Sequence, residues 1–335
     1  MILNKAVLHI LDPLSEISVM STACLNFVQP ANGEFINKQL EKIEKDPDRK
    51  KAKFQELSPF RDIAQAYSES GKTEQDLVIL STSIAQYYYD KLRETDDPQP
   101  CDILVAEYTE KENLSVALMI FSHKTAFTHN VISASEGPET EIIKHKAILP
   151  SGTSKPDSYA LVNLTDFSVV FFDKKKTRNG KSCYVLRDDI LSVEAEASSR
   201  EVVKAVDKAV KAVAEEFGAN STQALQKARN FIFESAAEGE YFELDDVSEV
   251  VFEDNLSMKN TLKEKLHETK LPKNVQVDRA YAERQATKHR IKTDTGIEIS
   301  FPSEFTDSTE YMEFINNPDG TISIELKKIG KIENK

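Results

Sequence analysis

The chain has 335 residues, 40% of them hydrophobic and 30% charged, and its 56 acidic and 43 basic side chains give a net charge of −13. This composition is that of a globular protein, and the length exceeds the roughly 250–300 residues at which one hydrophobic core stops growing. No apolar run reaches the about 20 residues of a membrane span, and three scattered cysteines, Cys24, Cys101 and Cys183, predict neither a disulfide framework nor a zinc site but fit a reducing cytoplasm.

The N-terminal third is predicted to be one strand followed by helices. Residues 2–11 have strand character, and residues 31–90 are expected to form helices interrupted at Pro47 and Pro59. An apolar stripe at helical spacing is assigned to the core rather than to base stacking; it consists of Leu77, Leu80, Ile84, Tyr87 and Tyr88.

The middle of the chain changes to strand character. Apolar, β-branched runs separated by short turns predict an antiparallel sheet rather than βαβ units. The runs are 103–108, 114–121, 126–132, 141–148, 159–164 and 167–172. A further strand at 184–186 is expected to pair with 169–172 around the turn Asn179-Gly180.

After this region the pattern becomes helical again. Ser198 and Glu201 form a capping box ahead of one apolar stripe, and a second helix ends near Gly239. Shorter helices are predicted at 247–252 and 256–267. The fold class is therefore α+β, with a mainly antiparallel sheet, N-terminal helices, a helical subdomain and C-terminal β-hairpins. The predicted division is 1–195, 196–270 and 271–335.

The C-terminal region predicts two tight β-hairpins. Alternating apolar and polar residues flank a first turn at 293–296 and a second at 317–320. In the second turn, proline pre-sets a negative φ and glycine accepts a positive one.

Three segments carry a resemblance to a known family. They are the opening MILNKAVLHILDP, the paired run DILVAEYTEKENLSVALMIFSHK and the segment DRAYAERQATKHRIKTDTGIEISFP. Together they resemble the bacterial 37-kilodalton nucleoid-associated protein family (NdpA, also called YejK) over most of the chain. The resemblance implies a cytoplasmic protein of the bacterial nucleoid that binds double-stranded DNA and is linked to type II topoisomerase function. It brings no catalytic residues.

Enzyme motifs are absent from the sequence. It contains no phosphate-binding glycine loop, no H-E-x-x-H and no G-x-S-x-G, and the tripeptide 294–296 is interpreted as a hairpin turn rather than as an aspartic-protease motif. The six histidines have no metal-ligand spacing, so the sequence predicts no metal, no cofactor and no enzyme activity.

Basic clusters are the candidates for phosphate contact. One cluster occupies the predicted hairpin tip at 174–181, where a solvated tip that protects a strand edge is the alternative. Another enters the first C-terminal hairpin, and a third, at 327–331, is also interpretable as a solubilising tail. The stretch 38–53 alternates with acidic residues, which favours ion pairs on a helix surface. The predicted DNA-binding residues are Lys174, Lys175, Lys176, Arg178, Lys181, Arg284, Lys288, Arg290 and Lys292.

Two functions from different classes fit these features. The first is a nucleoid-associated protein that binds double-stranded DNA with little sequence preference and modulates a type II topoisomerase. The second is an acidic adaptor that reaches the nucleoid through a partner, with a docking surface formed by Glu238, Glu240, Glu243, Asp245, Asp246 and Glu249. The net charge opposes the first function unless a local basic patch exists. No membrane partner is expected, and a homodimer is left open.

Overall fold

The computed structural model describes residues 1–134, 137–150, 154–239, 241–292, 294–302, 310–317 and 321–331. The chain forms two compact units, Met1–Glu196 (unit 1) and Ala197–Lys335 (unit 2). The predicted α+β class is confirmed, because helices accompany a large antiparallel sheet and several small hairpins. The finer boundary expected near residue 270 stays a prediction.

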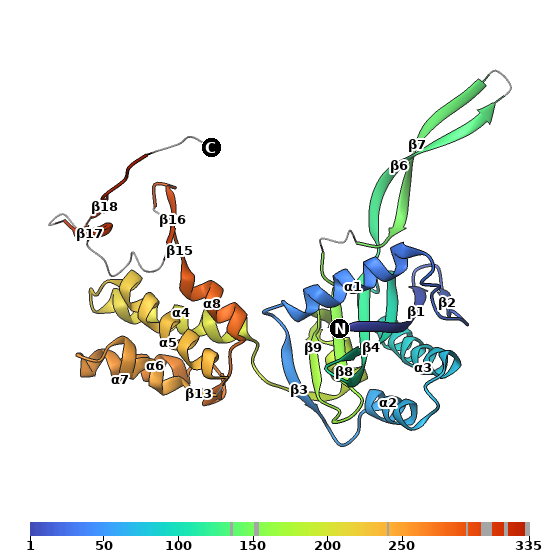
Figure 1. Ribbon diagram of the computed structural model, residues 1–335, viewed down its shortest axis with the longest axis horizontal. Coiled ribbons are helices and arrows are strands. Elements are labelled where there is room, and N and C mark those ends of the chain that lie inside the picture. The colour runs from blue at the N-terminus through green and yellow to red at the C-terminus, as the bar shows by residue number, and fades with distance from the viewer. Residues whose placement is uncertain are drawn as a thin grey trace. The chain divides into compact units, whose positions relative to one another are not determined.

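Unit 1 is built on an eight-stranded sheet in which every pairing is antiparallel (Figure 1). Its strands follow one another in the order β12 (Val193–Ala195), β3 (Lys50–Phe54), β9 (Val169–Phe172), β8 (Ser158–Asn163), β5 (Asn113–Ser122), β4 (Cys101–Glu110), β1 (Ile2–Asp12) and β2 (Ile17–Val19).

Helices cover both faces of this sheet. Helix α1 (Pro30–Glu44) packs on one face, and α2 (Pro59–Glu69), α3 (Glu74–Arg93) and the π-helix η1 (Val185–Leu191) pack on the other. The central strands β4 and β5 are consequently buried along nearly their whole length. This two-sided burial explains why their sequences are continuous apolar runs instead of alternating ones.

The apolar stripe of α3 is confirmed as core. Tyr88 is 1% exposed and Tyr89 is 6% exposed, so neither ring can stack on a nucleic-acid base. The helix begins at a capping box in which Thr73 and Asp76 each accept a hydrogen bond from the other's backbone N–H.

Two secondary-structure predictions in unit 1 are wrong. Residues 50–54, expected to be helical, form β3, because their alternation places Ala52 and Phe54 against the core while β9 and β12 supply ladder partners on both sides. Residues 184–186, expected to be a strand, lead into η1. Two carboxylates stabilise the start of this π-helix, since Asp188 accepts from the Tyr184 N–H and Asp173 accepts from the Arg187 N–H.

Two hairpins leave the main sheet. One joins β10 (Lys176–Arg178) to β11 (Lys181–Cys183), so the predicted basic hairpin exists, although it is formed by these strands. The other joins β6 (Lys124–Ala134) to β7 (Gly137–Ile148) and projects from the body of unit 1 as a two-stranded arm (Figure 1).

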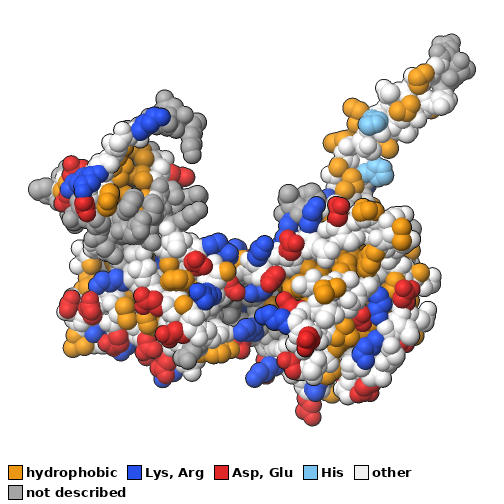
Figure 2. Space-filling model, viewed as in Figure 1, with side chains coloured by type: hydrophobic (Ala, Val, Ile, Leu, Met, Phe, Trp, Pro, Cys, Tyr) orange, Lys and Arg blue, Asp and Glu red, His pale blue; other side chains and the backbone are white. Residues whose placement is uncertain are grey.

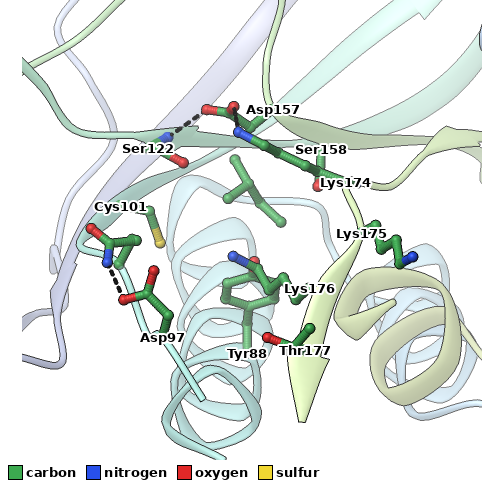
Figure 3. Close-up of a pocket in the computed structure, with 12 residues that line it drawn as sticks. Tyr88, Asp97, Cys101, Ser122, Asp157, Ser158, Lys174, Lys175, Lys176 and Thr177 are labelled. Carbon is green, nitrogen blue, oxygen red and sulfur yellow. Dashed lines mark hydrogen bonds and ion pairs between the residues drawn. The ribbon is translucent and has the colours of Figure 1, made fainter. Parts of the chain in front are cut away.

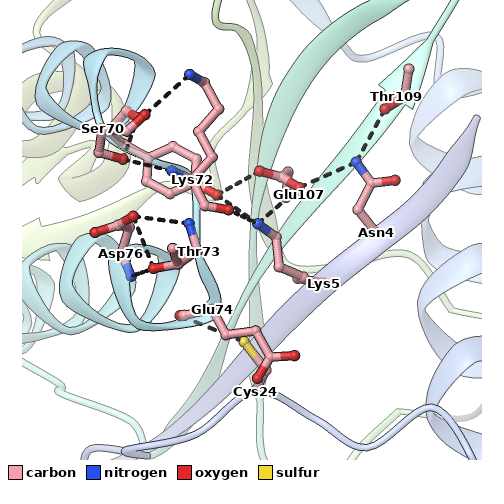
Figure 4. A network of polar contacts seen from close by, with 11 residues as sticks. Asn4, Lys5, Cys24, Ser70, Lys72, Thr73, Glu74, Asp76, Glu107 and Thr109 are labelled. Atoms are coloured by element: carbon pink, nitrogen blue, oxygen red, sulfur yellow. Dashed lines mark hydrogen bonds and ion pairs between the residues drawn. The ribbon is translucent and has the colours of Figure 1, made fainter.

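A buried ionic network joins β1, β4 and α2 (Figure 4). The Lys5 ammonium lies 3.2 Å from the Glu107 carboxylate, and these side chains are only 17% and 5% exposed. Tyr67 donates its hydroxyl proton to Glu107, and Lys5 donates to the carbonyl of Lys72 just before α3. Burial and the neighbouring carboxylate raise the pKa of Tyr67, which therefore stays a donor. The network thus fixes the entry of α3 against the sheet.

Unit 2 is a helical bundle followed by hairpins. Its core is formed by α4 (Ser199–Glu216), α5 (Ser221–Glu238), α6 (Leu244–Val251), α7 (Leu256–His267) and α8 (Arg279–Thr287), together with the short pair β13 (Phe242–Glu243) and β14 (Asn274–Val275). The Ser198–Glu201 capping box is confirmed, as is the left-handed Gly239 after α5. Helix α8, which buries Tyr281, Ala282 and Ala286, was not predicted.

Both C-terminal hairpins are confirmed. Strands β15 (Lys288–Lys292) and β16 (Glu298–Pro302) form one, and β17 (Met312–Asn316) and β18 (Ile322–Leu326) form the other. Thr293 in the first predicted turn and residues 318–320 in the second lie outside the described residues.

Replacing Lys5 by alanine tests the buried network. The substitution leaves the Glu107 carboxylate buried without its ammonium partner, so we expect unit 1 to lose about 3 kcal/mol of unfolding free energy. Urea denaturation followed by circular dichroism measures this loss. The control is Lys38→Ala on the exposed surface of α1, which should change stability by less than about 0.5 kcal/mol. Equal effects of the two substitutions would contradict the role of the network.

Candidate nucleic-acid interface

The basic hairpin β10–β11 is closed by a tight two-residue turn. Asn179 and Gly180 have φ angles of 53° and 71°. Two successive positive φ values are the requirement of a type I′ turn, which asparagine and glycine meet at low steric cost. The predicted Asn-Gly turn is therefore confirmed.

Carboxylates hold this hairpin against the body of unit 1. The N–H groups of Asn179 and Gly180 donate to the two Asp96 oxygens at 2.7 and 2.9 Å, and the Asp96 N–H donates back to the Thr177 carbonyl at 2.9 Å. Arg178 donates through both terminal nitrogens to Asp189, at 2.6 and 3.3 Å. Charge-assisted bonds of this kind contribute about 1.5–3 kcal/mol each. The hairpin is thus a braced element rather than a free finger.

The predicted DNA-binding residues of this hairpin divide into two groups. Arg178 is committed to Asp189, whose hydrogen bonds raise the pKa of the guanidinium. Lys174 forms an ion pair with Asp157 at 2.8 Å. Lys175 and Lys181 are exposed and Lys176 is half-buried, and none of these three has an ion-pair partner within the part of the chain that the structure describes. Only the second group carries charge that is free to meet a phosphate.

A pocket of about 400 Å³ lies at the base of the hairpin (Figure 3). Lys174, Lys175 and Lys176 line one wall, and Asp97 and Cys101 line the opposite side. Asp157 accepts from the Ser122 N–H at 2.9 Å and from Lys174, and although burial opposes the charge, these bonds leave its pKa lowered. The pocket therefore has a cationic rim fixed by an internal carboxylate.

Neither the thiol nor the phenol that lines the pocket is ionised at neutral pH. Burial raises the pKa of the Cys101 thiol to about 12, so the thiol is protonated at neutral pH and unreactive. Tyr88 at the back is buried, and its pKa is raised well above the ordinary value for the same reason.

A second set of free lysines lies on α1 and β3. Lys38, Lys45 and Lys53 are exposed and lack ion-pair partners among residues whose positions are described, so the ion pairs predicted for them on a helix surface are wrong. One of the acidic residues of this stretch, Asp46, is instead drawn inward, where it accepts from Lys155 at 2.6 Å and from Tyr159 at 2.8 Å. Figure 2 shows Lys and Arg side chains gathered over this part of unit 1.

The predicted C-terminal cluster is described only in part. Arg284 is exposed on α8 with its guanidinium 5.9 Å from the centre of the Tyr281 ring. Lys288, Arg290 and Lys292 belong to the backbone of β15, but their side chains lie outside the described residues. In the third cluster, Lys327 pairs with Glu313 and Lys328 with Glu310, which neutralises much of its charge.

Neither a metal site nor a membrane span is found among the residues described. These residues contain no group of three or more His, Cys, Asp or Glu side chains able to hold a metal ion. His123 instead bonds Asp102 at 3.0 Å. Nor does any helix in the described ranges have the length and apolar character needed to cross a membrane.

Comparison with known proteins identifies the family. Residues 7–333, nearly the whole chain, match the family model described as nucleoid-associated protein YejK. The chain belongs to this family. No curated protein sequence matches it. The YejK family is a family of nucleoid-associated proteins and not a known enzyme family, so the resemblance carried by the sequence segments is confirmed and the protein is nucleoid-associated.

Asp173, which precedes the β10–β11 hairpin, makes the stability of unit 1 depend on pH. Burial raises the pKa of this carboxyl to about 6 beside Lys174. The folded state therefore holds a proton that the unfolded state releases nearer pH 4, and the contribution of Asp173 to stability is greatest below about pH 4 and is lost as the pH rises through about 6.

Replacing Asp173 by asparagine removes this titration. Relative to the wild type, the variant should gain unfolding free energy between about pH 4 and pH 7, by at most about 3 kcal/mol. Any lost hydrogen bond to Ser158 or the Arg187 N–H adds an offset that does not depend on pH. Urea denaturation of both proteins across this range measures the difference. A difference that stays constant with pH would show that Asp173 is ionised throughout.

Proposed function

We propose that this member of the YejK family binds double-stranded DNA with little sequence preference, through backbone phosphates, and that the braced hairpin of unit 1 supplies the principal contacts. The observation that carries the proposal is the set of three lysines, Lys175, Lys176 and Lys181, which have no ion-pair partner among the described residues and lie in or beside a braced hairpin. Nucleoid association of the family supports the same conclusion.

The bracing of the hairpin favours binding. Ammonium groups on a flexible loop lose conformational freedom when they meet a phosphate, whereas a protrusion that is already fixed loses less. Asp96 accepts from the backbone N–H groups of the turn, and Asp189 holds the Arg178 side chain. The lysine side chains remain long enough to follow the phosphates of any sequence, which fits readout without base specificity.

Long-range electrostatics set the conditions for this contact. Acidic side chains outnumber basic ones in each unit, so the chain as a whole repels DNA. Binding then depends on a few phosphates neutralised by local lysines. Because each such contact releases counterions, the logarithm of the affinity should fall linearly with the logarithm of the salt concentration. Lys38, Lys45 and Lys53 on α1 and β3 are a second candidate group in unit 1, and the cluster from Arg284 to Lys292 is one in unit 2.

The adaptor function has weaker support. Of the acidic residues that would form its docking surface, Glu249 pairs with Lys259 and Lys263, Glu243 pairs with Lys273, and Asp245 bonds His267. The two lysines lower the pKa of Glu249 to about 2. Much of this acidic surface is therefore compensated within unit 2, which reduces its attraction for a basic partner.

We also propose that the protein modulates a type II topoisomerase. Its support is the family resemblance and the acidic balance of the chain, which suits contact with a basic DNA-handling enzyme. Relaxation assays with a purified type II topoisomerase, with and without the protein, test this part. Unchanged rates at saturating protein would contradict it while leaving DNA binding intact.

The DNA-binding proposal predicts a specific change in salt dependence. We expect Lys175→Glu, Lys176→Glu and Lys181→Glu combined to reduce the slope of log affinity against log salt by about 3, since each phosphate contact contributes about 0.9. Fluorescence anisotropy with a labelled duplex of about 30 bp across a salt series measures the slope. Arg178 is left unchanged because its loss would free Asp189 and loosen the hairpin.

A matched control separates phosphate contact from net charge. Lys204→Glu, Lys208→Glu and Lys211→Glu change the total charge equally on the exposed surface of α4. This control should weaken binding only through long-range repulsion and should keep most of the wild-type slope. Equal loss of slope in the two variants would contradict a contact through the hairpin, and no binding by the wild type at low salt would favour the adaptor.

A further inference from the structure

The arm β6–β7 carries large apolar side chains in open solvent. Phe127 is 72% exposed, Val131 57% and Ile142 79%. The two strands pair only with each other in the described structure, as a separate two-stranded sheet. A two-stranded hairpin alone is only marginally stable in water, and long unpaired edges invite further strand pairing. The arm therefore has the character of an incomplete sheet.

The three most exposed large apolar residues lie on one face of the arm, whereas Ile132, 42% exposed, lies on the other. Phe127 stands opposite Lys144, His129 opposite Ile142, and Val131 opposite Thr140. Because directly opposed residues share a face, Phe127, Val131 and Ile142 form one stripe, with neighbours across the strands and along the diagonal. Solvation of this stripe costs free energy that a covering surface would recover.

The charges of β7 are arranged in two halves. Glu139 and Glu141 occupy its first half, Ile142 and Ile143 the middle, and Lys144, His145 and Lys146 its second half. Lys144, Lys146 and Glu139 have no ion-pair partner within the described part of the chain, while Glu141 accepts only from Asn130, at 2.9 Å. Alternation along the strand places Glu139 and Glu141 on the face of His145, and Lys144 and Lys146 on the opposite face. An identical strand that runs antiparallel would therefore set each acidic half beside a basic half, with a glutamate directly opposite His145, whereas a parallel copy would oppose like charges.

We propose that the free edge of β7 pairs with β7 of a second copy of this chain, so that two arms join into one four-stranded antiparallel sheet about a two-fold axis near Ile142 and Ile143. Such an interface is self-complementary, as two-fold symmetry requires. With the axis at either isoleucine, a glutamate, Glu139 or Glu141, stands opposite His145 of the other copy. The joined sheet also aligns two apolar stripes on one face.

The same features disfavour DNA as the occupant of the arm. Glu139 and Glu141 lie toward the end of the hairpin that would enter a groove first, and both are exposed. Carboxylates there would repel phosphates, while large apolar side chains gain little from a hydrated backbone. The proposal does not depend on DNA contact by the β10–β11 hairpin.

Charge-swap complementation of the full-length protein tests the proposal. Light scattering after size exclusion should give the wild type twice the mass of one 37.7 kDa chain. Variant one combines Glu139→Lys with Glu141→Lys. Variant two combines Lys144→Glu, His145→Glu and Lys146→Glu, so that a carboxylate stands directly opposite a glutamate of a like copy. Each variant alone should have the mass of one chain, because its arms carry like charges in both halves. An equimolar mixture should regain the doubled mass, since every acidic half then meets a basic one.

The outcomes distinguish this interface from others. Glu69→Lys with Asp90→Lys, at exposed positions of α2 and α3, is the charge-matched control and should keep the doubled mass. Circular dichroism checks that all variants are folded. A monomeric wild type, two variants that both remain dimeric, or variants that fail to recombine would each overturn the proposal.

Discussion

Coverage of both faces of the eight-stranded sheet is the constraint on which the rest of unit 1 depends. Helix α1 fills one side, and α2, α3 and η1 fill the other, so β4 and β5 are buried along nearly their whole length, apart from the end at Cys101, Ile120 and Ser122 that lines the pocket. The candidate functional surfaces are therefore the β10–β11 hairpin with the pocket at its base, the β6–β7 arm and the ends of α1 and β3. The buried network around Lys5 and Glu107 supports this arrangement by fixing the start of α3, the helix whose other end accepts from Arg178 of the hairpin at the Lys91 carbonyl.

The positions of the carboxylates, and not only their number, determine where the surface of the protein is basic. Asp96, Asp189 and Asp157 lie inside or against unit 1 and hold basic or N–H groups of the hairpin region. Asp46 does the same for Lys155 beneath α1. An acidic chain can therefore present unpaired lysines locally, because some of its carboxylates are paired with donors inside the fold. Net charge then limits the strength and range of DNA attraction without excluding contact.

Much of this architecture could be predicted from the sequence, where local pattern and tertiary environment agree. The strands from 103 to 172, the capping box at Ser198 and the C-terminal hairpins followed from periodicity and turn residues. β3 could not be predicted, because Lys50–Phe54 becomes a strand only through pairing with β9 and β12. At the candidate site the position of the basic turn was predictable. Arg178 is paired and Lys175 is free because of tertiary contacts, which local pattern does not reveal. The separation of β6 and β7 from the main sheet was likewise not predictable, because both have the same strand character as their neighbours.

The most direct measurement of the central claim is lysine protection by DNA, with acetylation of the protein and mass spectrometry of its peptides. A duplex bound at low salt should shield Lys175, Lys176 and Lys181 from the reagent while Lys204 and Lys208 on α4 react as in the free protein. Shielding confined to other lysines, with the hairpin fully reactive in the bound state, would contradict the account.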